Sequence, residues 1–215
     1  MGNTNTNIAA DSAKKRSSVF EVRNIVQIGI LSAAAFLLMF LEFPLWFTPG
    51  FYRLDLSELP VLIGAFAMGP FAGILTELIK ELLYFFLHGS STAGVGDIAN
   101  FIFGCCLAVP ASMIYQRRKT RKNALIGMAL GTVLMSVAGW IANAYVLLPL
   151  YGAAFHMPMS ALIAMGTKMN PSVTSLSTFV LFIVVPFNLF KGAVVSLLTM
   201  LIYKRVSPIL HGRLR

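Results

Sequence analysis

Residues 184–198, VVPFNLFKGAVVSLL, place an asparagine and a lysine inside an otherwise apolar run. Asn188 and Lys191 are three residues apart, so a helix brings both to one face. A charged side chain at the centre of a membrane helix costs about 3 kcal/mol on insertion scales, and such side chains usually face a cavity or a partner. The run therefore predicts a membrane helix that carries part of a functional site.

The whole chain has the composition of an integral membrane protein. Of its 215 residues, 57% are hydrophobic and 12% are charged, and the mean hydropathy is +0.78. Apolar runs recur along the chain, and a helix of about 20 residues crosses a bilayer. The pattern predicts an all-α bundle of six transmembrane helices, with spans at about 25–43, 60–69, 71–87, 98–115, 124–148 and 179–203. The second and third spans should be separated by the turn MGPFAG, residues 68–73.

The basic residues predict the orientation of the bundle. Thirteen of the seventeen Lys and Arg residues lie in the first 24 residues, in the loop QRRKTRK at 116–122, or from residue 204 onward. Six spans place these three segments on one side, and basic segments are typically cytoplasmic, so both termini should be cytoplasmic. We expect a disordered cytoplasmic leader at 1–24, a membrane domain at 25–204 and a basic tail at 205–215. Segregated charge beside apolar spans argues against nucleic acid as the partner.

Motifs for catalysis or nucleotide binding are incomplete. The stretch GSSTAGVGD, residues 89–97, begins like a phosphate loop, but Val95 and Gly96 stand where Lys and Ser/Thr are needed. The sequence contains no HExxH or G-x-S-x-G, and its three histidines are scattered over loops and a tail. We expect no catalytic residue, no metal site and no cofactor.

Further polar residues fall inside the predicted spans. Glu77, Lys80 and Glu81 share one helix face, either as a self-neutralising brace or as a functional group. Lys191 has no carboxylate nearby in sequence and needs a partner from elsewhere. Pro186 should bend the helix or begin its regular part. Asn143, Asn188 and Lys191 could converge on a pocket in the outer half of the membrane, although the asparagines could instead join helices.

Two outer loops support a pocket. The loop FYRLDLSELP, residues 51–60, mixes aromatic and charged residues and is a candidate lid. In GSSTAGVGDIANF, residues 89–101, we expect Asp97 to cap the following helix, and glycines before it allow a ligand to approach the backbone.

Four blocks together resemble a known family: RLDLSELP, KELLYFFLHGSSTAGVGDIANFIFG, NAYVLLPLYG and PFNLFKGAVVSLL. They are similar to the riboflavin-specific substrate-binding (S) component of energy-coupling factor (ECF) transporters, the RibU family, over roughly residues 25–204. This resemblance implies a six-helix protein of the prokaryotic plasma membrane that binds riboflavin in an outward-facing pocket. It also implies a transmembrane coupling subunit and two cytoplasmic ATPases as partners, which would supply the ATP chemistry missing here.

The resemblance also suggests site residues. The family's polar ligand contacts match Asn143, Asn188 and Lys191, with ligand oxygens and Asn188 expected to solvate the lysine. Its closing loop matches the segment that holds Leu54 and Asp55. Further candidates in matching motifs are Lys80, Gly96 and Asp97. Small residues on the first helix dock the coupling subunit in this family, and the chain offers Gly29, Ala33 and Ala34 in a small-xxx-small pattern rather than the usual pair of alanines.

Rival functions predict different observations. An S component for thiamin or pantothenate would keep the fold and rearrange the polar groups. A proton-coupled transporter would use Glu77 and Glu81 and would lose uptake with the proton gradient. A membrane alcohol phosphatidyltransferase would need a D-G-x-x-A-R type signature, which the sequence lacks.

Overall fold

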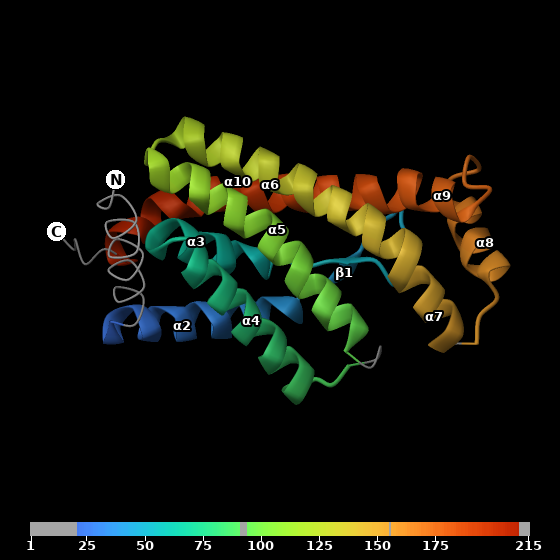
Figure 1. Cartoon of the computed structure of the whole chain (residues 1–215), viewed down its shortest axis with the longest axis horizontal. Helices are drawn as coiled ribbons and strands as arrows, with labels where there is room; N and C mark the ends of the chain where they lie inside the picture. The colour runs from blue at the N-terminus through green and yellow to red at the C-terminus, as the bar shows by residue number, and fades with distance from the viewer. Residues whose placement is uncertain (1–20, 91–93, 155, 211–215) are drawn as a thin grey trace, which may run out of the picture.

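The computed structural model describes residues 21–90, 94–154 and 156–210, which are mostly helical (Figure 1). The first half holds α2 (Val22–Met39), the short strands β1 (Phe43–Pro44) and β2 (Arg53–Leu54), α3 (Glu58–Met68) and α4 (Pro70–Leu87). The second half holds α5 (Val95–Arg117), α6 (Arg121–Ala142), the π-helical turn η1 (Asn143–Leu147), α7 (Leu148–Ala154), α8 (Met159–Met169), α9 (Leu176–Phe179), the π-helical turn η2 (Val180–Val184) and α10 (Val185–Leu210).

The turn between α3 and α4 forms where the sequence predicts it. Gly69 has a φ of +103°, a backbone conformation that residues other than glycine rarely adopt, and Pro70 begins the next helix. At the basic turn between α5 and α6, Thr120 caps α6 by accepting a hydrogen bond from the backbone N–H of Asn123.

The core of the bundle is formed mainly by α3, α5, α6 and α10. Its largest fully buried side chains include Phe66, Leu107 and Met128. Helices α5 and α6 pack very closely, because a Cβ at Gly127 or Gly131 would overlap the α5 backbone at Ala111 or Leu107. Small residues at such crossings allow membrane helices to approach one another.

Four helical stretches of the described chain are long and apolar enough to cross a membrane: Val22–Met39, Val95–Arg117, Arg121–Ala153 and Leu176–Tyr203. The predicted second and third spans correspond to α3, a shorter apolar helix of 11 residues, and to α4, which carries Glu77, Lys80 and Glu81. Large apolar side chains such as Phe86, which is 75% exposed, lie on the outside of the bundle, as expected of a surface that faces lipid.

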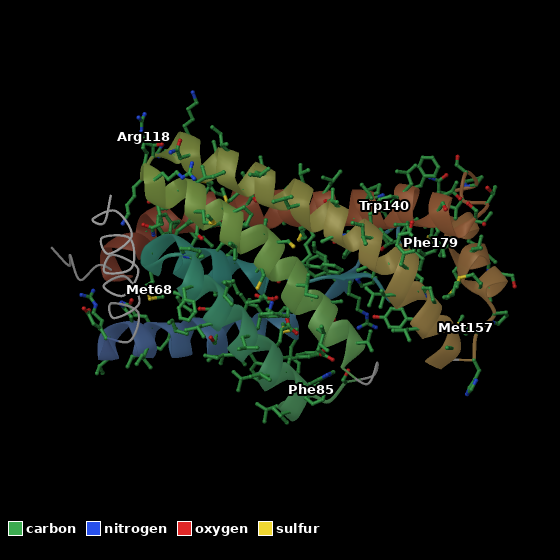
Figure 2. The ribbon with its side chains drawn as sticks, viewed as in Figure 1. Met68, Phe85, Arg118, Trp140, Met157 and Phe179 are labelled. Carbon is green, nitrogen blue, oxygen red and sulfur yellow. The ribbon has the colours of Figure 1, made fainter. Side chains whose placement is uncertain are left out.

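The start of α2, the α5–α6 turn and the end of α10 lie at one end of the molecule (Figure 1). Arg118 and Met68 are both at this end, whereas Met157 is at the opposite end (Figure 2). The basic loop at 116–122 and the described parts of both terminal helices therefore lie at the same end of the bundle.

The structure adds elements that periodicity did not predict. The fifth apolar stretch continues beyond residue 148 through α7, and α8 and α9 occupy the connection that follows. Helix α8 is held by close contact of Gly166 with Phe179 and Val173. The prediction for Pro186 is confirmed, because the regular helix α10 begins at Val185, directly after η2.

A matched pair of glycine substitutions tests the close α5–α6 contact. Gly131→Ala should lower the free energy of unfolding by about 1 to 3 kcal/mol, because its methyl group would overlap the Leu107 backbone. Gly29→Ala is the control, since a Cβ on Gly29 meets no atom within 4 Å. Thermal unfolding in detergent compares the two variants. Equal melting temperatures would contradict the packing described here.

Candidate functional site

A cavity of about 280 Å³ opens between the loop that carries β1 and β2 and the helices α4, α5, α6 and α10. Its apolar walls include Phe51, Phe103, Met135 and Phe187. Polar side chains enter it from the loop, from α3, α4, α5, α7 and α10, and from η1. Apolar walls with a few fixed polar groups are typical of sites for small organic ligands, whose pockets usually begin at about 300 Å³.

Most of the residues proposed from the sequence line this one cavity: Asp55, Gly96, Asp97, Asn143, Asn188 and Lys191. Two do not line it. Leu54 is buried against Leu45 and Phe187, and Lys80 is completely buried beneath the cavity. A contact role in this cavity is therefore not supported for the side chains of Leu54 and Lys80 in this conformation.

Lys191 is paired with a carboxylate that is 136 positions away in sequence. Its Nζ lies 2.8 Å from Oδ2 of Asp55, and both side chains are buried. The expectation that Lys191 needs a partner from elsewhere is confirmed. The charged partner is Asp55, whereas the sequence analysis expected ligand oxygens and Asn188 to solvate the lysine. A buried ammonium is stabilised more by a charged acceptor than by a neutral amide.

The Asp55 carboxylate is held on both oxygens. Oδ1 accepts hydrogen bonds from the backbone N–H of Ser57, at 2.8 Å, and from the Ser57 hydroxyl, while Oδ2 accepts from Lys191. Burial by itself would raise the pKa of Asp55, but the ammonium groups of Lys191 and Lys80 and the hydrogen bonds lower it to about 2. Asp55 is therefore ionised at neutral pH.

Asn143 is oriented by two hydrogen bonds. The Tyr52 hydroxyl donates to its Oδ1 at 2.6 Å, and its Nδ2 donates to the carbonyl of Gly139 at 2.8 Å. Tyr52 also packs its ring against Phe51 and Phe187. Burial, then the nearby Tyr151, raises the pKa of Tyr52, so its phenol keeps its proton. Tyr52 was not predicted as a site residue, although the aromatic pair Phe51-Tyr52 in the proposed lid was the available signal.

Asn188 enters the cavity from α10 beside Gly139 of α6. A Cβ on Gly139 would overlap the amide nitrogen of Asn188, so only glycine leaves room for this side chain. The amides of Asn143, which directly follows α6, and of Asn188, from α10, therefore both lie against Gly139. This is the convergence that the sequence predicted.

The loop before α5 is tied to the first turn of that helix. The Ser90 hydroxyl donates to Oδ2 of Asp97 at 2.5 Å and accepts from the backbone N–H of Gly94 at 2.8 Å. The expectation that Asp97 is the N-cap is wrong. The helix begins at Val95 with Gly94 as its cap, because Gly94 has a φ of +87° and turns the chain three residues before Asp97.

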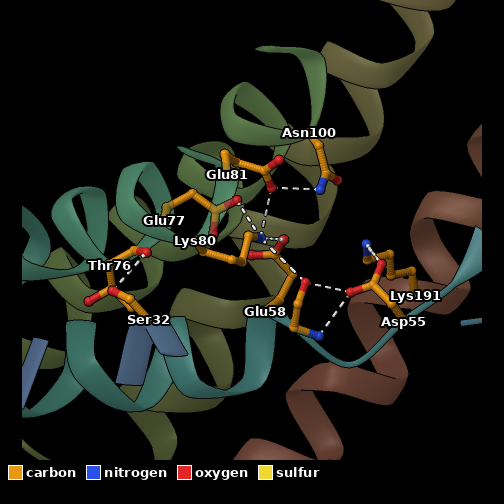
Figure 3. Close-up of polar contacts among 10 residues, drawn as sticks. Ser32, Asp55, Glu58, Thr76, Glu77, Lys80, Glu81, Asn100 and Lys191 are labelled. Atoms are coloured by element: carbon orange, nitrogen blue, oxygen red, sulfur yellow. Dashed lines mark hydrogen bonds and ion pairs between the residues drawn. The ribbon is translucent and has the colours of Figure 1, made fainter. Parts of the chain in front are cut away.

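Beneath the cavity lies a buried cluster of charges (Figure 3). The Lys80 Nζ is 2.7 Å from Oε1 of Glu77, 2.9 Å from Oε1 of Glu58 and 3.1 Å from Oε1 of Glu81. The predicted interaction among Glu77, Lys80 and Glu81 is confirmed. Glu58 was missed as a member, because the sequence analysis placed it only in the proposed lid.

Comparison with known proteins gives the family. The family model described as "ECF transporter, substrate-specific component" matches residues 23–203. The chain belongs to this family. Its relatives include a "Riboflavin transporter RibU" of Staphylococcus aureus, 33% identical over 93% of this chain and 98% of that protein. Another is a "Riboflavin transporter FmnP" of Bacillus subtilis, 33% identical over 87% of this chain and 94% of that protein.

A solved structure supports the same conclusion. The chain of "Structure and mechanism of the S component of a bacterial ECF transporter" matches with a TM-score of 0.66 and 33% identity, over 86% of this chain and 96% of that chain. These relatives are transporter components rather than enzymes. In this S component, the described residues contain no group of three or more His, Cys, Asp or Glu side chains that could hold a metal ion.

The residues proposed for docking lie on α2 of this S component. Gly29 and Ala33 are exposed and Ala34 is partly buried, so the small-xxx-small pattern is on the outer surface of the bundle. The cavity is lined by other elements, apart from Met39 near the end of α2. Docking at this surface remains a prediction.

The Asp55–Lys191 pair gives a pH-dependent prediction. Asp55→Asn should lower the free energy of unfolding by about 3 to 5 kcal/mol at neutral pH, because it leaves a buried ammonium without its anion. The pKa of Asp55 is lowered from 3.8 to about 2, so the stabilisation is complete above pH 3.8 and is lost as the pH falls through 2.

The melting temperatures of wild type and Asp55→Asn, measured in detergent from pH 8 to pH 3, test this assignment. The difference between the two melting temperatures should stay constant from pH 8 to about pH 5. It should shrink only below pH 3.8, the ordinary pKa of an aspartate carboxyl. A difference that already disappears between pH 7 and pH 5 would show that Asp55 is not held by Lys191.

Proposed function

We propose that this S component binds riboflavin and captures it for an ECF-type vitamin importer. The observation that carries the proposal is the cavity in which Asn143, Asn188 and Lys191 meet between aromatic walls. The names of the relatives, riboflavin transporters at 33% identity over most of the chain, support the choice of ligand.

The chemistry of the cavity suits a flavin. An isoalloxazine ring is flat, with apolar faces and a hydrogen-bonding pyrimidine edge. The side chains of Phe51, Phe103 and Phe187 offer apolar contact to the faces. An asparagine amide both donates and accepts, which suits adjacent C=O and N–H groups, while a lysine ammonium donates to a carbonyl or a ribityl hydroxyl.

Each site residue has a proposed role. Asn143, Asn188 and Lys191 contact the polar edge or the ribityl chain. Asp55 holds Lys191, and the loop that carries Leu54 and Asp55 closes over the ligand. Gly96 and Asp97 line the side of the cavity formed by α5, where they contact ligand hydroxyls.

The transport cycle needs partners and an orientation. We propose six membrane crossings at the predicted spans, with α3 and α4 as the second and third, and with both termini in the cytoplasm. The domain boundaries at 24 and 204 follow from this topology. A transmembrane coupling subunit would dock at Gly29, Ala33 and Ala34, and two ATPases would supply the energy, in the plasma membrane of a prokaryote.

Fluorescence titration with the detergent-purified protein tests the ligand. Wild type should quench riboflavin fluorescence stoichiometrically, and thiamin and pantothenate should not compete. Lys191→Met should weaken binding about ten- to hundredfold, because a hydrogen bond to a charged group contributes about 1.5 to 3 kcal/mol. Lys168→Met, on the exposed face of α8, is the control and should bind as wild type does.

Two outcomes would contradict these assignments. Competition by thiamin or pantothenate in place of riboflavin would make the protein an S component for another vitamin. Unchanged riboflavin affinity in Lys191→Met would leave the ligand assignment intact and remove Lys191 from the binding site.

The docking surface has its own test. Ala33→Leu should preserve riboflavin binding and should reduce co-purification with the coupling subunit at least severalfold, because a bulky side chain separates closely packed helices. Ala153→Leu, the same change at an exposed position on α7, is the matched control. Equal recovery of the coupling subunit with both variants would exclude Ala33 from the interface.

A further inference from the structure

Lys80 is completely buried, carries a charge and does not line the cavity, so direct contact with a ligand does not explain its place. Its ammonium is held by carboxylates from two helices, Glu58 of α3 and Glu77 and Glu81 of α4. Glu81 is held in turn by Asn100 of α5, whose Nδ2 donates to its Oε1 at 2.7 Å. The Lys80 ammonium is therefore held in place by a network of contacts that joins α3, α4 and α5.

One further contact connects the Lys80 ammonium to the cavity. The Lys80 Nζ donates to the Ser57 hydroxyl at 3.3 Å, and that hydroxyl donates to Oδ1 of Asp55. A hydroxyl can accept hydrogen bonds and has one proton to donate, whereas an ammonium donates and cannot accept. Because the hydroxyl accepts from Lys80, its own proton is directed to Asp55.

The remaining oxygen of Asp55 then faces Lys191. With Oδ1 occupied by both hydrogen bonds from Ser57, Oδ2 accepts from the Lys191 Nζ at 2.8 Å. An ammonium has three donors, so fixing one of them on Asp55 limits the directions of the other two. The orientation of Lys191 in the cavity thus depends on a chain of contacts that starts at Lys80.

We propose that Lys80 is a positioning residue for vitamin binding, which acts through Ser57 and Asp55 to hold the Lys191 ammonium toward the ligand. The inference rests on the proposed function, in which Lys191 contacts riboflavin. It assigns the buried charge cluster a role in affinity in addition to bracing α3, α4 and α5. It gives the buried Lys80 a role in binding although its side chain does not line the cavity.

Ser57→Ala tests the relay without disturbing the carboxylates around Lys80. This variant should bind riboflavin about tenfold more weakly, a loss of about 1.4 kcal/mol, chiefly through faster dissociation. The matched control is Ser32→Ala. Ser32 is equally buried and its hydroxyl makes one interhelical hydrogen bond, to the carbonyl of Thr76, but it has no contact in the relay. Its affinity should change less than twofold.

A double-mutant comparison separates positioning from general stability. If Ser57 acts through Lys191, then Ser57→Ala should change the affinity less than twofold in the Lys191→Met background. If the double variant instead loses affinity by the product of the two single fold-changes, the two residues act independently and the proposal is overturned. A Ser57→Ala variant that loses melting temperature but binds as Ser32→Ala does would also overturn it.

Lys80→Met is the second variant and should weaken binding at least as much as Ser57→Ala. It also leaves three buried carboxylates without their cation, so if it fails to fold, the Ser57 comparison decides the question. Wild-type protein is titrated with riboflavin first. Absence of binding there would overturn the proposed function, whereas normal wild-type binding with an unaffected Ser57→Ala would overturn only the positioning role.

Discussion

A lysine ammonium buried among apolar helices is stable only beside an anion that is itself held in place, and the Asp55–Lys191 pair meets this requirement. The pair joins the outer loop to α10. Because Asp55 lies one residue after β2, its position also determines how the loop packs on the bundle. The hairpin register, in which Phe43 faces Leu54, and the Glu42–Arg53 ion pair at 2.6 Å then complete the loop above the cavity.

The cavity is polar where the helices are irregular. Asn143 begins η1, and its side-chain amide donates to the Gly139 carbonyl one turn earlier. Asn188 lies shortly after η2, where α10 begins. π-turns often occur at functional sites, because they alter the direction of the side chains around them. Both asparagines that we propose as ligand contacts lie in or next to such turns, while the regular parts of the helices pack against one another.

Sequence reasoning succeeded where burial makes a residue costly. Lys191, Asn188 and Asn143 stand out in apolar runs, so the sequence singled them out as candidates for one pocket, and all three line the cavity. Sequence reasoning failed where the partner of a residue is distant in the sequence and only the folded structure brings the two together. Asp55 was proposed as a site residue but not as the partner of Lys191, and Tyr52 was missed, because both lie in a loop whose path has no periodicity. Glu58 was seen only as part of that loop. Helices α8 and α9 were missed because short helices outside the apolar runs depend on packing, here of Gly166 against Phe179.

The two π-turns also change how this chain can be compared with others. One extra residue within a helix rotates everything beyond it by about 100°, since a regular turn contains 3.6 residues. A helical wheel drawn continuously from α6 into α7 would therefore assign the residues after Leu147 to the wrong face. Loss or gain of a single residue at η1 or η2 in a relative would turn a different set of side chains toward the cavity while leaving the inner halves of both helices in phase.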